Sequence, residues 1–577
     1  MPVLPFGEFR PDVSDLNTGF TSKLRNVLVR ADGYGPMKDI AAFTQAAAAA
    51  CRGYFFARRE DGSVAVFMGT STKLYLLNNT TLAWGDVSVG AGTYSTLNAD
   101  ANWTFAQFNN IVLATQKNAV LQSYDLTSSS AFANNAGSPP QAGWIAIINR
   151  FVVLADLLDD PFRVQWSGLN AVTAWTAGTA LSDFQDLPDG GRARSVAEMS
   201  GDVGLILQDV NVRRMIFAPG SDVVFQIDKL SDDLGIVAPY STAVANGRAF
   251  FLSTKGFVEM DASGASAFIG EEKVDRTFLG QHEGSAPAEI RDLAYDSSNT
   301  QLVQGAADPN RNIVLWVYKS VSGQSGLFDR GLAYHWTLKR WSPVMVSGEY
   351  LAQVSRPGLT MEGLDAIAPG AIVITGAADN GAGLVRITVG STATLTTGDV
   401  RTISGVLGTT EANGTWTITK INATTFDLQG STFANAYVSG GVVAGSLDDL
   451  PFSLDDISTA TLPSLAAFNS SHKLGFFSGA TLEARIETAE QSMDGWRINI
   501  NGLRPITDAA DVYGFTTMRD NLNAAHTDGD ESAIDSDGFC PLLDESRYAR
   551  GAIRIPAATT WNYARGVEPE IIRAGML

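Results

Sequence analysis

Short apolar runs separated by polar turns repeat along most of the chain. From Cys51 the segment CRGYFFARREDGSVAVFMGT places two β-prone runs on either side of Asp61-Gly62, and Asp-Gly between apolar runs is a strong hairpin signal. The same pattern of two strands of about five residues around a polar turn recurs in WTFAQFNNIVLAT, WIAIINRFVVLAD, GDVGLILQDVNVRRMIFA, ANGRAFFLSTKGFVEMDA and RNIVLWVYK. The pattern predicts a series of antiparallel hairpins.

Hairpins at fairly even spacing, without helical patterns between them, predict an all-β protein: a sandwich, a barrel or a propeller. Size favours the propeller, because the roughly 440 residues with this rhythm far exceed one sandwich of about 100 residues and suffice for about six to eight four-stranded blades. Exact repeats and a WD-type signature are absent from the sequence, so this topology rests on size and rhythm alone.

The pattern changes at two places and so divides the chain into four segments. Residues 1–50 contain several prolines and no sustained period, which predicts an extended N-terminal arm ending in an alanine-rich connector. Residues 51–364 form the first part of the propeller-like body, and residues 446–577 the second. Residues 365–445 are poor in charge and rich in Gly and Thr, which predicts an inserted small β-barrel or sandwich between loop-like neighbours.

Within the insert, two features of EANGTW and the residues after it bear on the fold. Its Asn and Gly are typical of a turn that needs positive φ. Trp416, Ile418 and Ile421 are predicted to form a core face. In the body, Trp166, Trp316, Trp336 and Trp341 are predicted to lie in blade cores rather than to form a ligand platform.

Composition supports a folded, β-rich protein and argues against nucleic-acid binding. The chain is 45% hydrophobic and 18% charged, and its 56 glycines suit many tight turns. The net charge of −20 lacks the basic footprint of a phosphate-binding protein. An acidic surface is compatible with a conduit that DNA passes through without sticking, although simple solubilising charge is the more common reason for one.

Cysteine usage and hydropathy bear on the compartment. Two cysteines, Cys51 and Cys540, are too few to hold this chain by disulfides, which suits assembly in a reducing cytoplasm. No apolar run of about 18 residues and no signal-peptide pattern occur. We therefore expect a protein without membrane insertion or an export signal.

Several motifs resemble those of a known family, in an order that extends along the chain. The opening FGEFRPDVSDLNTGFTSKLRNVLVRADGYGPM, VQWSG at 164–168, LPDGG at 187–191, VRRMIFAPG, LGIVAPYS, FFLSTKGFVEMDASG, GEEKVDRTF and LAYHWTLKRWSPV resemble the tail propeller proteins of short-tailed bacteriophages, described as nozzle, hub or stabilisation proteins. TTGDVRTISGVLGTTEANGTWTITKINATTFDLQGSTF resembles a small β-domain that also occurs in ubiquitin-activating enzymes and as an insert in phage tail proteins. There it implies no ubiquitin chemistry.

The sequence contains no catalytic or metal-binding constellation. His282, His335, His472 and His526 are widely spaced, without HExxH or a Cys-His cluster, and the Gly-rich GTSTK at 69–73 reads as a hairpin turn. The best metal candidate is the acidic loop HTDGDESAIDSDG, whose Asp528, Asp530, Asp535 and Asp537 could offer oxygen ligands to calcium. Its order does not fit an EF-hand, because Ala533 and Phe539 occupy the places of the glycine and the bidentate acid. A solvated loop is favoured, and no catalytic, cofactor or metal residue is predicted.

The sequence therefore predicts a structural protein of the phage tail and not an enzyme. The resemblance implies a virion protein, assembled in the host cytoplasm as a hexameric ring that contacts other tail proteins and forms part of the DNA ejection channel. Arginines such as Arg213 and Arg214 are then expected at subunit contacts or strand edges and not on phosphates. The main alternative is a glycan-binding or depolymerising tail fibre or spike protein, which would need exposed aromatics with carboxylates. A soluble propeller enzyme is a third hypothesis, disfavoured by the missing constellations.

Overall fold

The computed structural model describes residues 3–200, 202–221, 223–281, 291–354, 372–392, 395–444, 463–492 and 496–573. These residues form strands and turns, with short helical turns such as α1 (Asp275–Phe278). The chain divides into two compact units. The first comprises Met1–Leu77, Trp84–Arg356 and Thr459–Leu577, and the second comprises Asn78–Ala83 and Pro357–Ser458.

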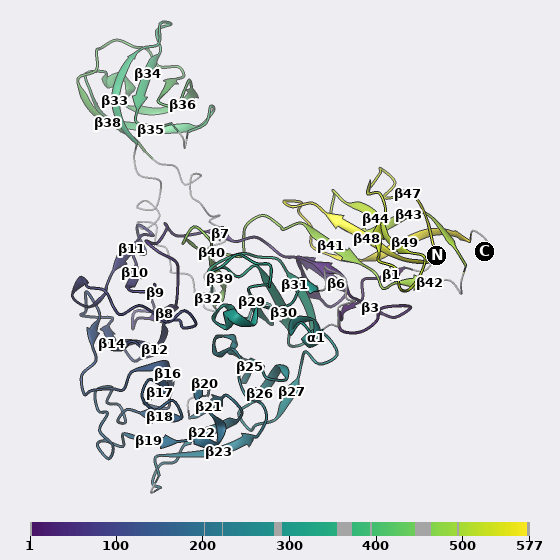
Figure 1. Cartoon of the computed structure of the whole chain (residues 1–577). Coiled ribbons are helices and arrows are strands. Elements are labelled where there is room, and N and C mark those ends of the chain that lie inside the picture. The colour runs from purple at the N-terminus through teal and green to yellow at the C-terminus, as the bar shows by residue number, and fades with distance from the viewer. Residues whose placement is uncertain are drawn as a thin grey trace. The chain divides into compact units, whose positions relative to one another are not determined.

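Seven four-stranded sheets of described residues make up most of the first unit, which makes it a seven-bladed β-propeller (Figure 1). In the first six blades the strands follow one another along the chain: β8 (Tyr54–Arg58), β9 (Val64–Gly69), β10 (Leu74–Leu77), β11 (Trp84–Asp86); β12 (Thr104–Phe108), β13 (Ile111–Gln116), β14 (Ala119–Asp125), β15 (Ala133–Asn134); β16 (Ala142–Ile148), β17 (Phe151–Leu157), β18 (Arg163–Trp166), β19 (Asp183–Asp186); β20 (Ala193–Ser200), β21 (Val203–Gln208), β22 (Val212–Phe217), β23 (Phe225–Ser231); β24 (Ala243–Ala245), β25 (Arg248–Ser253), β26 (Gly256–Asp261), β27 (Ser266–Phe268); and β28 (Gln304–Asp308), β29 (Ile313–Tyr318), β30 (Arg330–His335), β31 (Arg340–Val344). The predicted all-β propeller fold is confirmed, within the predicted range of blade numbers.

The hairpins form where the turn residues permit them. Asn246 and Gly247 both have positive φ, at 51° and 71°, and they join the directly paired residues Ala245 and Arg248. This is the backbone that a two-residue hairpin needs to match the strand twist. Gly62, with φ of 83°, lies in the predicted turn between β8 and β9, a longer loop between the paired residues Arg58 and Val64.

The seventh blade joins a strand of the N-terminal segment to strands from the later part of the chain. Its sheet has the order β32-β39-β40-β7, with β32 (Tyr350–Val354), β39 (Ser464–Phe468), β40 (Leu474–Phe476) and β7 (Ala41–Ala42). Ala41 and Ala42 pair with Phe476 and Gly475. A Cβ at Gly475 would lie only 2.3 Å from the Ala41 carbonyl oxygen, so this close approach requires glycine. The innermost strand β32 contacts both β28 and β8, which closes the ring.

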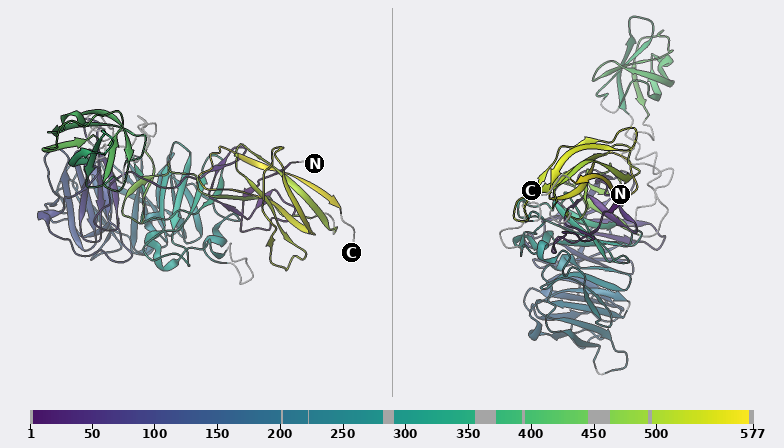
Figure 2. Two further views of the ribbon diagram at one scale, coloured as in Figure 1. Left: turned by 90° about the horizontal axis from the view of Figure 1, so that it is seen from above. Right: turned by 90° about the vertical axis from the view of Figure 1, so that its right-hand side faces the viewer.

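The two chain ends also build a pair of packed sheets beyond the propeller (Figure 2). One sheet contains β1 (Leu4–Pro5), β5 (Val27–Arg30), β6 (Gly33–Pro36), β43 (Ile498–Thr507), β47 (Cys540–Ser546) and β49 (Ala564–Arg573). The other contains β4 (Leu24–Arg25), β41 (Ala484–Glu487), β42 (Gln491–Ser492), β44 (Tyr513–Arg519), β45 (Thr527–Asp528), β46 (Ser532–Ala533) and β48 (Tyr548–Ile555). Gly551 of β48 faces Val567 of β49 so closely that a Cβ would lie 2.8 Å from its methyl group.

These sheets differ from the expected division of the chain. Residues 1–50, expected as an extended arm, supply short strands to both sheets and to the seventh blade. Of residues 446–577, expected to continue the propeller, the described part contributes only β39 and β40 to a blade. Strands of two to four residues interrupted by prolines are too short to show a hydrophobic period in the sequence. They are extended because they pair with a partner strand.

Three of the four blade tryptophans lie in the core as predicted, and Trp336 is the exception. Trp316 and Trp341 are fully buried, and their indole N–H groups donate to the carbonyl oxygens of Ser241 and Ile269, both at 2.8 Å. Trp166 is also buried, as predicted. Trp336 is only half-buried and stacks on Phe250 with ring centroids 6.2 Å apart.

The second unit contains a closed six-stranded barrel in the order β33-β34-β37-β36-β35-β38. Its strands are β33 (Ile372–Asp379), β34 (Val385–Val389), β35 (Val400–Leu407), β36 (Gly414–Lys420), β37 (Thr425–Leu428) and β38 (Ser439–Val443). Ile418 is fully buried in the barrel core and Trp416 packs against that core. Ile421 is 45% exposed, so its predicted core position was wrong. It lies beyond the end of β36, three positions from Ile418, where strand alternation points it away from the core.

The EANGTW turn was predicted half correctly. Gly414 has φ of 143°, a value that favours glycine. Asn413 has an ordinary φ of −70°. Its side-chain amide instead accepts from the Val406 N–H at 2.9 Å and donates to the Val406 carbonyl at 3.0 Å, which ties the turn to the neighbouring strand β35.

The insert connects at paired positions on both sides. Ile372 and Val443, near the two ends of the barrel, are directly paired. In the propeller, Val354 and Ser464 are likewise directly paired across β32 and β39. The loop-like neighbours predicted from sequence lie largely in residues 355–371 and 445–462, outside the described residues. The insert thus interrupts what would otherwise be an ordinary hairpin of the seventh blade.

We predict that deleting residues 365–445 and bridging the gap with a short Gly/Ser linker leaves the first unit folded. The paired residues Val354 and Ser464 already fix the strand ends that the linker must join. The truncated protein should be soluble and monodisperse, with the β-type circular dichroism of the remaining chain. A matched variant lacking residues 464–476, which removes two strands of the seventh blade, should aggregate. Uniform insolubility of the 365–445 deletion would contradict this domain assignment.

Candidate functional site

A candidate site lies among the innermost strands of the propeller, along its central channel. Two neighbouring cavities, of about 270 Å³ and about 190 Å³, are lined by innermost strands of several blades. Residues shared by the two cavities include Tyr54, Thr242, Gly305 and Tyr350. These residues come from the first, fifth, sixth and seventh blades or the links that enter them, so the site depends on ring closure.

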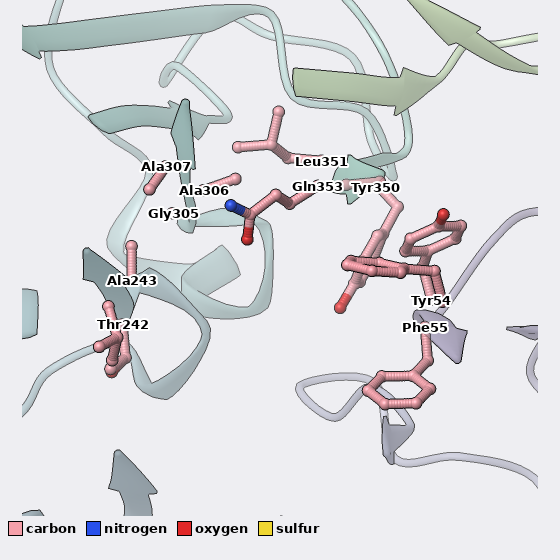
Figure 3. A pocket seen from close by; sticks show the side chains of 13 residues that line it. Tyr54, Phe55, Thr242, Ala243, Gly305, Ala306, Ala307, Tyr350, Leu351 and Gln353 are labelled. Carbon is pink, nitrogen blue, oxygen red and sulfur yellow. The ribbon is translucent and has the colours of Figure 1, made fainter. Parts of the chain in front are cut away.

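The channel wall is uneven. Half-buried aromatic rings line it on the first three blades: Phe55 and Phe56 on β8, Phe105 on β12 and Trp144 on β16. Phe55 stacks on Phe105 at 6.0 Å between centroids, with an interplanar angle of 12°. The fifth and sixth blades present smaller residues instead, which are Ala243, Val244, Gly305, Ala306 and Ala307. The hollow therefore lies between an aromatic wall and a wall of small residues (Figure 3).

Gly305 shows why the side chains on the wall of small residues cannot be larger. A Cβ at this position would lie 2.3 Å from the Ser241 carbonyl oxygen and 2.9 Å from the Trp316 Nε1. The same Trp316 N–H donates to the Ser241 carbonyl at 2.8 Å. The core of the sixth blade therefore excludes any larger side chain from this part of the wall.

Neutral polar groups lie among these walls. The Gln353 amide points into the hollow (Figure 3). The Tyr54 hydroxyl and Thr242 Oγ1 are buried without a hydrogen-bond partner among the described residues. Burial raises the pKa of Tyr54 and of Tyr350 well above the ordinary tyrosine value, so both phenols are neutral at physiological pH. No charged side chain appears among the described residues that line the two cavities.

A hydrogen-bond network crosses the channel beside the smaller cavity. The Asn102 backbone N–H, in the link before the second blade, donates to the Tyr240 hydroxyl at 2.8 Å, in the link before the fifth. The Asn102 amide donates to the Gln301 carbonyl at 3.2 Å, in the link before the sixth blade. Arg52, before the first blade, donates to Asn102 Oδ1 at 2.9 Å. Residues from four blade links thus meet across the axis and obstruct the channel.

Burial shapes the ionisation of this network. It raises the pKa of Tyr240 to about 12, and the Asn102 backbone hydrogen bond only partly opposes the rise. Burial also lowers the pKa of Arg52. The Tyr240 hydroxyl remains protonated under ordinary conditions, so it can both accept from Asn102 N–H and donate to the Asn102 carbonyl at 3.3 Å.

The acidic loop proposed for calcium is engaged in protein contacts. Asp528 accepts two hydrogen bonds of 2.8 Å from the Arg485 guanidinium. Asp535 Oδ1 accepts from the backbone N–H groups of Asp537 and Phe539, both at 2.9 Å. Asp530 and Asp537 are both exposed. Among the described residues, no group of three His, Cys, Asp or Glu side chains is placed to hold a metal ion.

The histidines and cysteines do not assemble. His335 Nδ1 accepts from the Leu338 backbone N–H, His472 contacts Glu349, and His526 contacts Glu490. His282 lies outside the described residues. Cys51 and Cys540 are both buried as free thiols, and burial raises the pKa of each. Thiols held in this protonated state are poor nucleophiles.

Arg213 and Arg214 are used within the fourth blade. Arg213 is buried, donates to Gln208 Oε1 at 2.8 Å and pairs with Asp189. Arg214 pairs with Asp228 at 3.0 Å. Their strand β22 is central in its sheet and not an edge strand. The expected role at a strand edge was therefore wrong, because both guanidinium groups pair with carboxylates of the same blade or of the link that enters it.

The sequence did not point to the channel residues. They come from strands far apart in the chain, and only the closed ring places them together. One signal was present: Tyr54, Phe55 and Phe56 are consecutive in one strand. Because side chains alternate across a strand, three adjacent aromatic residues cannot all enter one core face. The arrangement offers binding surfaces and neutral hydrogen-bonding groups rather than a nucleophile, a general base or metal ligands.

Comparison with known proteins adds only likeness to other β-propellers. No protein-family model matches the chain, and no curated protein sequence matches it. Similar solved structures include a quinoprotein alcohol dehydrogenase-like protein from Bacteroides thetaiotaomicron, with 13% identity, 51% of this chain and 66% of that chain covered, and a TM-score of 0.32. Hsv2p from Kluyveromyces lactis is 11% identical over 50% of this chain and 96% of its own, with a TM-score of 0.25. The chain covers slightly less than two thirds of the Bacteroides protein, and scores this low carry no functional argument.

No helix in the described part of the chain is long and apolar enough to cross a membrane.

A buried carboxyl outside the channel has unusual electrostatics. Asp275, at the start of α1, is 6% exposed, and its Oδ1 accepts from the Phe257 N–H at 3.1 Å. Its Oδ2 has no partner among the described residues, and a Cβ at Gly270 would lie 2.0 Å from Oδ1. Burial, with smaller contributions from the charges of Asp12 and Glu271, raises the pKa of Asp275 to about 7.

We predict that Asp275→Asn changes the pH dependence of stability. A carboxyl whose folded pKa is raised from 3.8 to about 7 binds more protons folded than unfolded, so the wild type loses stability as pH rises between these values. The asparagine of the variant does not titrate, so the variant does not share this loss of stability. The difference in melting temperature, variant minus wild type, should therefore increase from pH 5 to pH 8. Calorimetry would measure this, with Asp183→Asn, an exposed residue of β19, as the control. A constant difference between variant and wild type would contradict the assignment.

Proposed function

We propose that the protein is a structural component of a phage tail, a nozzle or hub protein, several copies of which form a ring around the tail axis. The observation that carries this proposal is that three motifs of the family resemblance meet at one junction. They are the opening segment 6–37, GEEKVDRTF at 270–278 and LAYHWTLKRWSPV at 332–344. Motifs that hold the folded body together are what we expect of a protein whose function is assembly.

The contacts at this junction are specific. Lys273 Nζ donates to Glu8 Oε1 at 2.8 Å and to the Lys339 carbonyl oxygen at 2.7 Å, so one ammonium group joins all three motifs. Asp12 accepts from the backbone N–H groups of Arg276 and Thr277 at 2.9 and 2.8 Å. These bonds use the motif residues to fasten the N-terminal segment to the propeller.

The same motifs share an aromatic contact. Arg340 donates to the Tyr34 hydroxyl at 3.1 Å, and its guanidinium lies 5.2 Å from the Tyr34 ring centroid. Tyr34 is fully buried, and its own hydroxyl donates to the Gly7 carbonyl at 2.6 Å. The junction is therefore a packed part of the body, as suits a protein that transmits mechanical load between neighbours.

The proposal also defines where DNA would pass. The Tyr240–Asn102 hydrogen bond obstructs the propeller channel, and a duplex whose major groove alone is about 12 Å wide cannot use cavities of about 270 Å³. A conduit would have to run between copies of the protein. The ring, not the single propeller, is the unit that would form the ejection channel.

Electron microscopy of the purified protein and of virions tests the proposal. We expect a symmetric ring with an axial opening wider than the propeller channel, with the hexamer implied by the family resemblance as the expected symmetry. In virions, labelling of the insert should place the protein in the tail. A monomer at all concentrations, together with absence from virions, would overturn the proposal.

We further predict that the isolated protein binds duplex DNA negligibly at about 0.15 M salt. Its net charge of −20 leaves little counterion release to drive association. Gel-shift titration should show no complex with a dissociation constant below roughly 10 μM. For comparison, proteins that bind DNA non-specifically reach dissociation constants on the order of 1 μM. A basic DNA-binding protein titrated in parallel serves as the positive control. Measurable tighter binding would contradict a passive conduit.

A further inference from the structure

The channel cavities combine features that suit a ligand. Phe55 and Phe56 line the larger cavity, while Phe105 and Trp144 line the smaller one, and all four rings are half-buried. Aromatic faces offer large contact area together with a negative electrostatic surface that attracts polarised C–H groups. The opposite wall of small residues leaves room for a flat molecule against them.

The size of the hollow limits what can enter. A cavity of about 150 Å³ accommodates benzene in a protein core, and typical pockets for drug-sized ligands begin near 300 Å³. The larger cavity, at about 270 Å³, lies between these values. It suits one six-membered ring with its substituents and excludes a polymer threaded through the axis.

The polar groups specify the chemistry of the ligand's edge. The Gln353 amide offers both donor and acceptor atoms, and the hydroxyls of Tyr54 and Thr242 are buried without a protein partner among the described residues. Unpaired buried hydroxyls are costly and favour a ligand that hydrogen-bonds to them. Since no charged side chain lines either cavity among the described residues, a charged ligand would lose its hydration without compensation.

From these features we infer that the propeller channel binds a neutral saccharide, one pyranose residue with its C–H face on the aromatic wall and its hydroxyls toward Gln353 and Thr242. The C–H face of a pyranose supplies the apolar side, and its edge supplies several hydroxyl groups. Without a carboxylate pair in the described lining, the site binds the sugar and does not hydrolyse it. This inference does not depend on ring assembly or on the phage-tail proposal.

Saturation-transfer NMR and calorimetric titration of the full chain test the inference. The probes are glucose and N-acetylglucosamine as neutral sugars, N-acetylneuraminic acid as a charged sugar, and indole as an aromatic without hydroxyls. We expect a neutral sugar to bind with a dissociation constant on the order of 1 mM and the other two probes to bind more weakly.

Two variants locate the site. Gln353→Ala removes the amide, and Thr242→Val removes a hydroxyl that no described protein group uses, at nearly constant shape. Each should weaken sugar binding about tenfold, the loss of one buried hydrogen bond. Gln185→Ala, on the exposed outer strand β19, should leave binding unchanged. Circular dichroism and melting temperature confirm that each variant is folded, and Thr242→Val should retain wild-type stability even where Gln353→Ala does not.

Each other outcome overturns the inference. No binding of either neutral sugar at about 50 mM, well above the expected constant, would remove the proposed ligand class. Sugar binding that neither Gln353→Ala nor Thr242→Val weakens would place the site elsewhere. Equal or tighter binding of the charged sugar or of indole would reject a neutral saccharide in favour of another chemistry.

Discussion

Closure of the seventh blade is the constraint on which the rest of this structure depends. The short strand β7 near the N-terminus completes a sheet whose other strands follow much later in the sequence. An open propeller would expose strand edges and the apolar faces between blades. The Phe43 N–H adds a hydrogen bond of 2.8 Å to the Leu474 carbonyl, and the Phe43 ring packs against Phe476 at 5.3 Å. The N-terminal segment and the strands after the insert must therefore both be in place before the ring is complete.

The same closure explains the pair of packed sheets beyond the propeller. Once the N-terminal segment has reached the seventh blade, the residues before it lie beside the strands that follow that blade, and the two sets pair in common sheets. Buried charges fasten this arrangement. Arg550 donates to Asp15 at 2.9 Å, with both side chains less than 8% exposed. Removing one member of such a pair costs about 3–5 kcal/mol, because it leaves a buried charge unpaired. The N-terminal segment is thus part of the folded body and not a free arm.

Local sequence patterns predicted the features that local chemistry determines. The Asn, Asp and Gly turns and the apolar runs between them identified the hairpins, and chain length identified a propeller of about the right size. The blade number could not be read from the pattern, since it depends on which distant strand completes the last sheet. Ile421 was misplaced because it lies beyond the end of its strand and at an odd spacing from Ile418, so it does not share the core face of Trp416 and Ile418. The short strands of residues 1–50 were missed because they take their order from partners at the other end of the chain.

The lack of exact repeats, which made the propeller hard to recognise, is also what gives the channel its shape. Seven identical blades would place the same side chains around the axis, and the channel would be either uniformly filled or uniformly open. Here the inner strands of the first three blades contribute aromatic rings to the cavity lining, whereas those of the fifth and sixth contribute mostly alanine and glycine, with one valine and one glutamine. The hollow therefore has unlike walls, while the Tyr240–Asn102 hydrogen bond obstructs the channel beside it. Blade divergence thus converts a symmetric channel into a one-sided pocket, and any passage for a long polymer must be formed by surfaces outside the propeller.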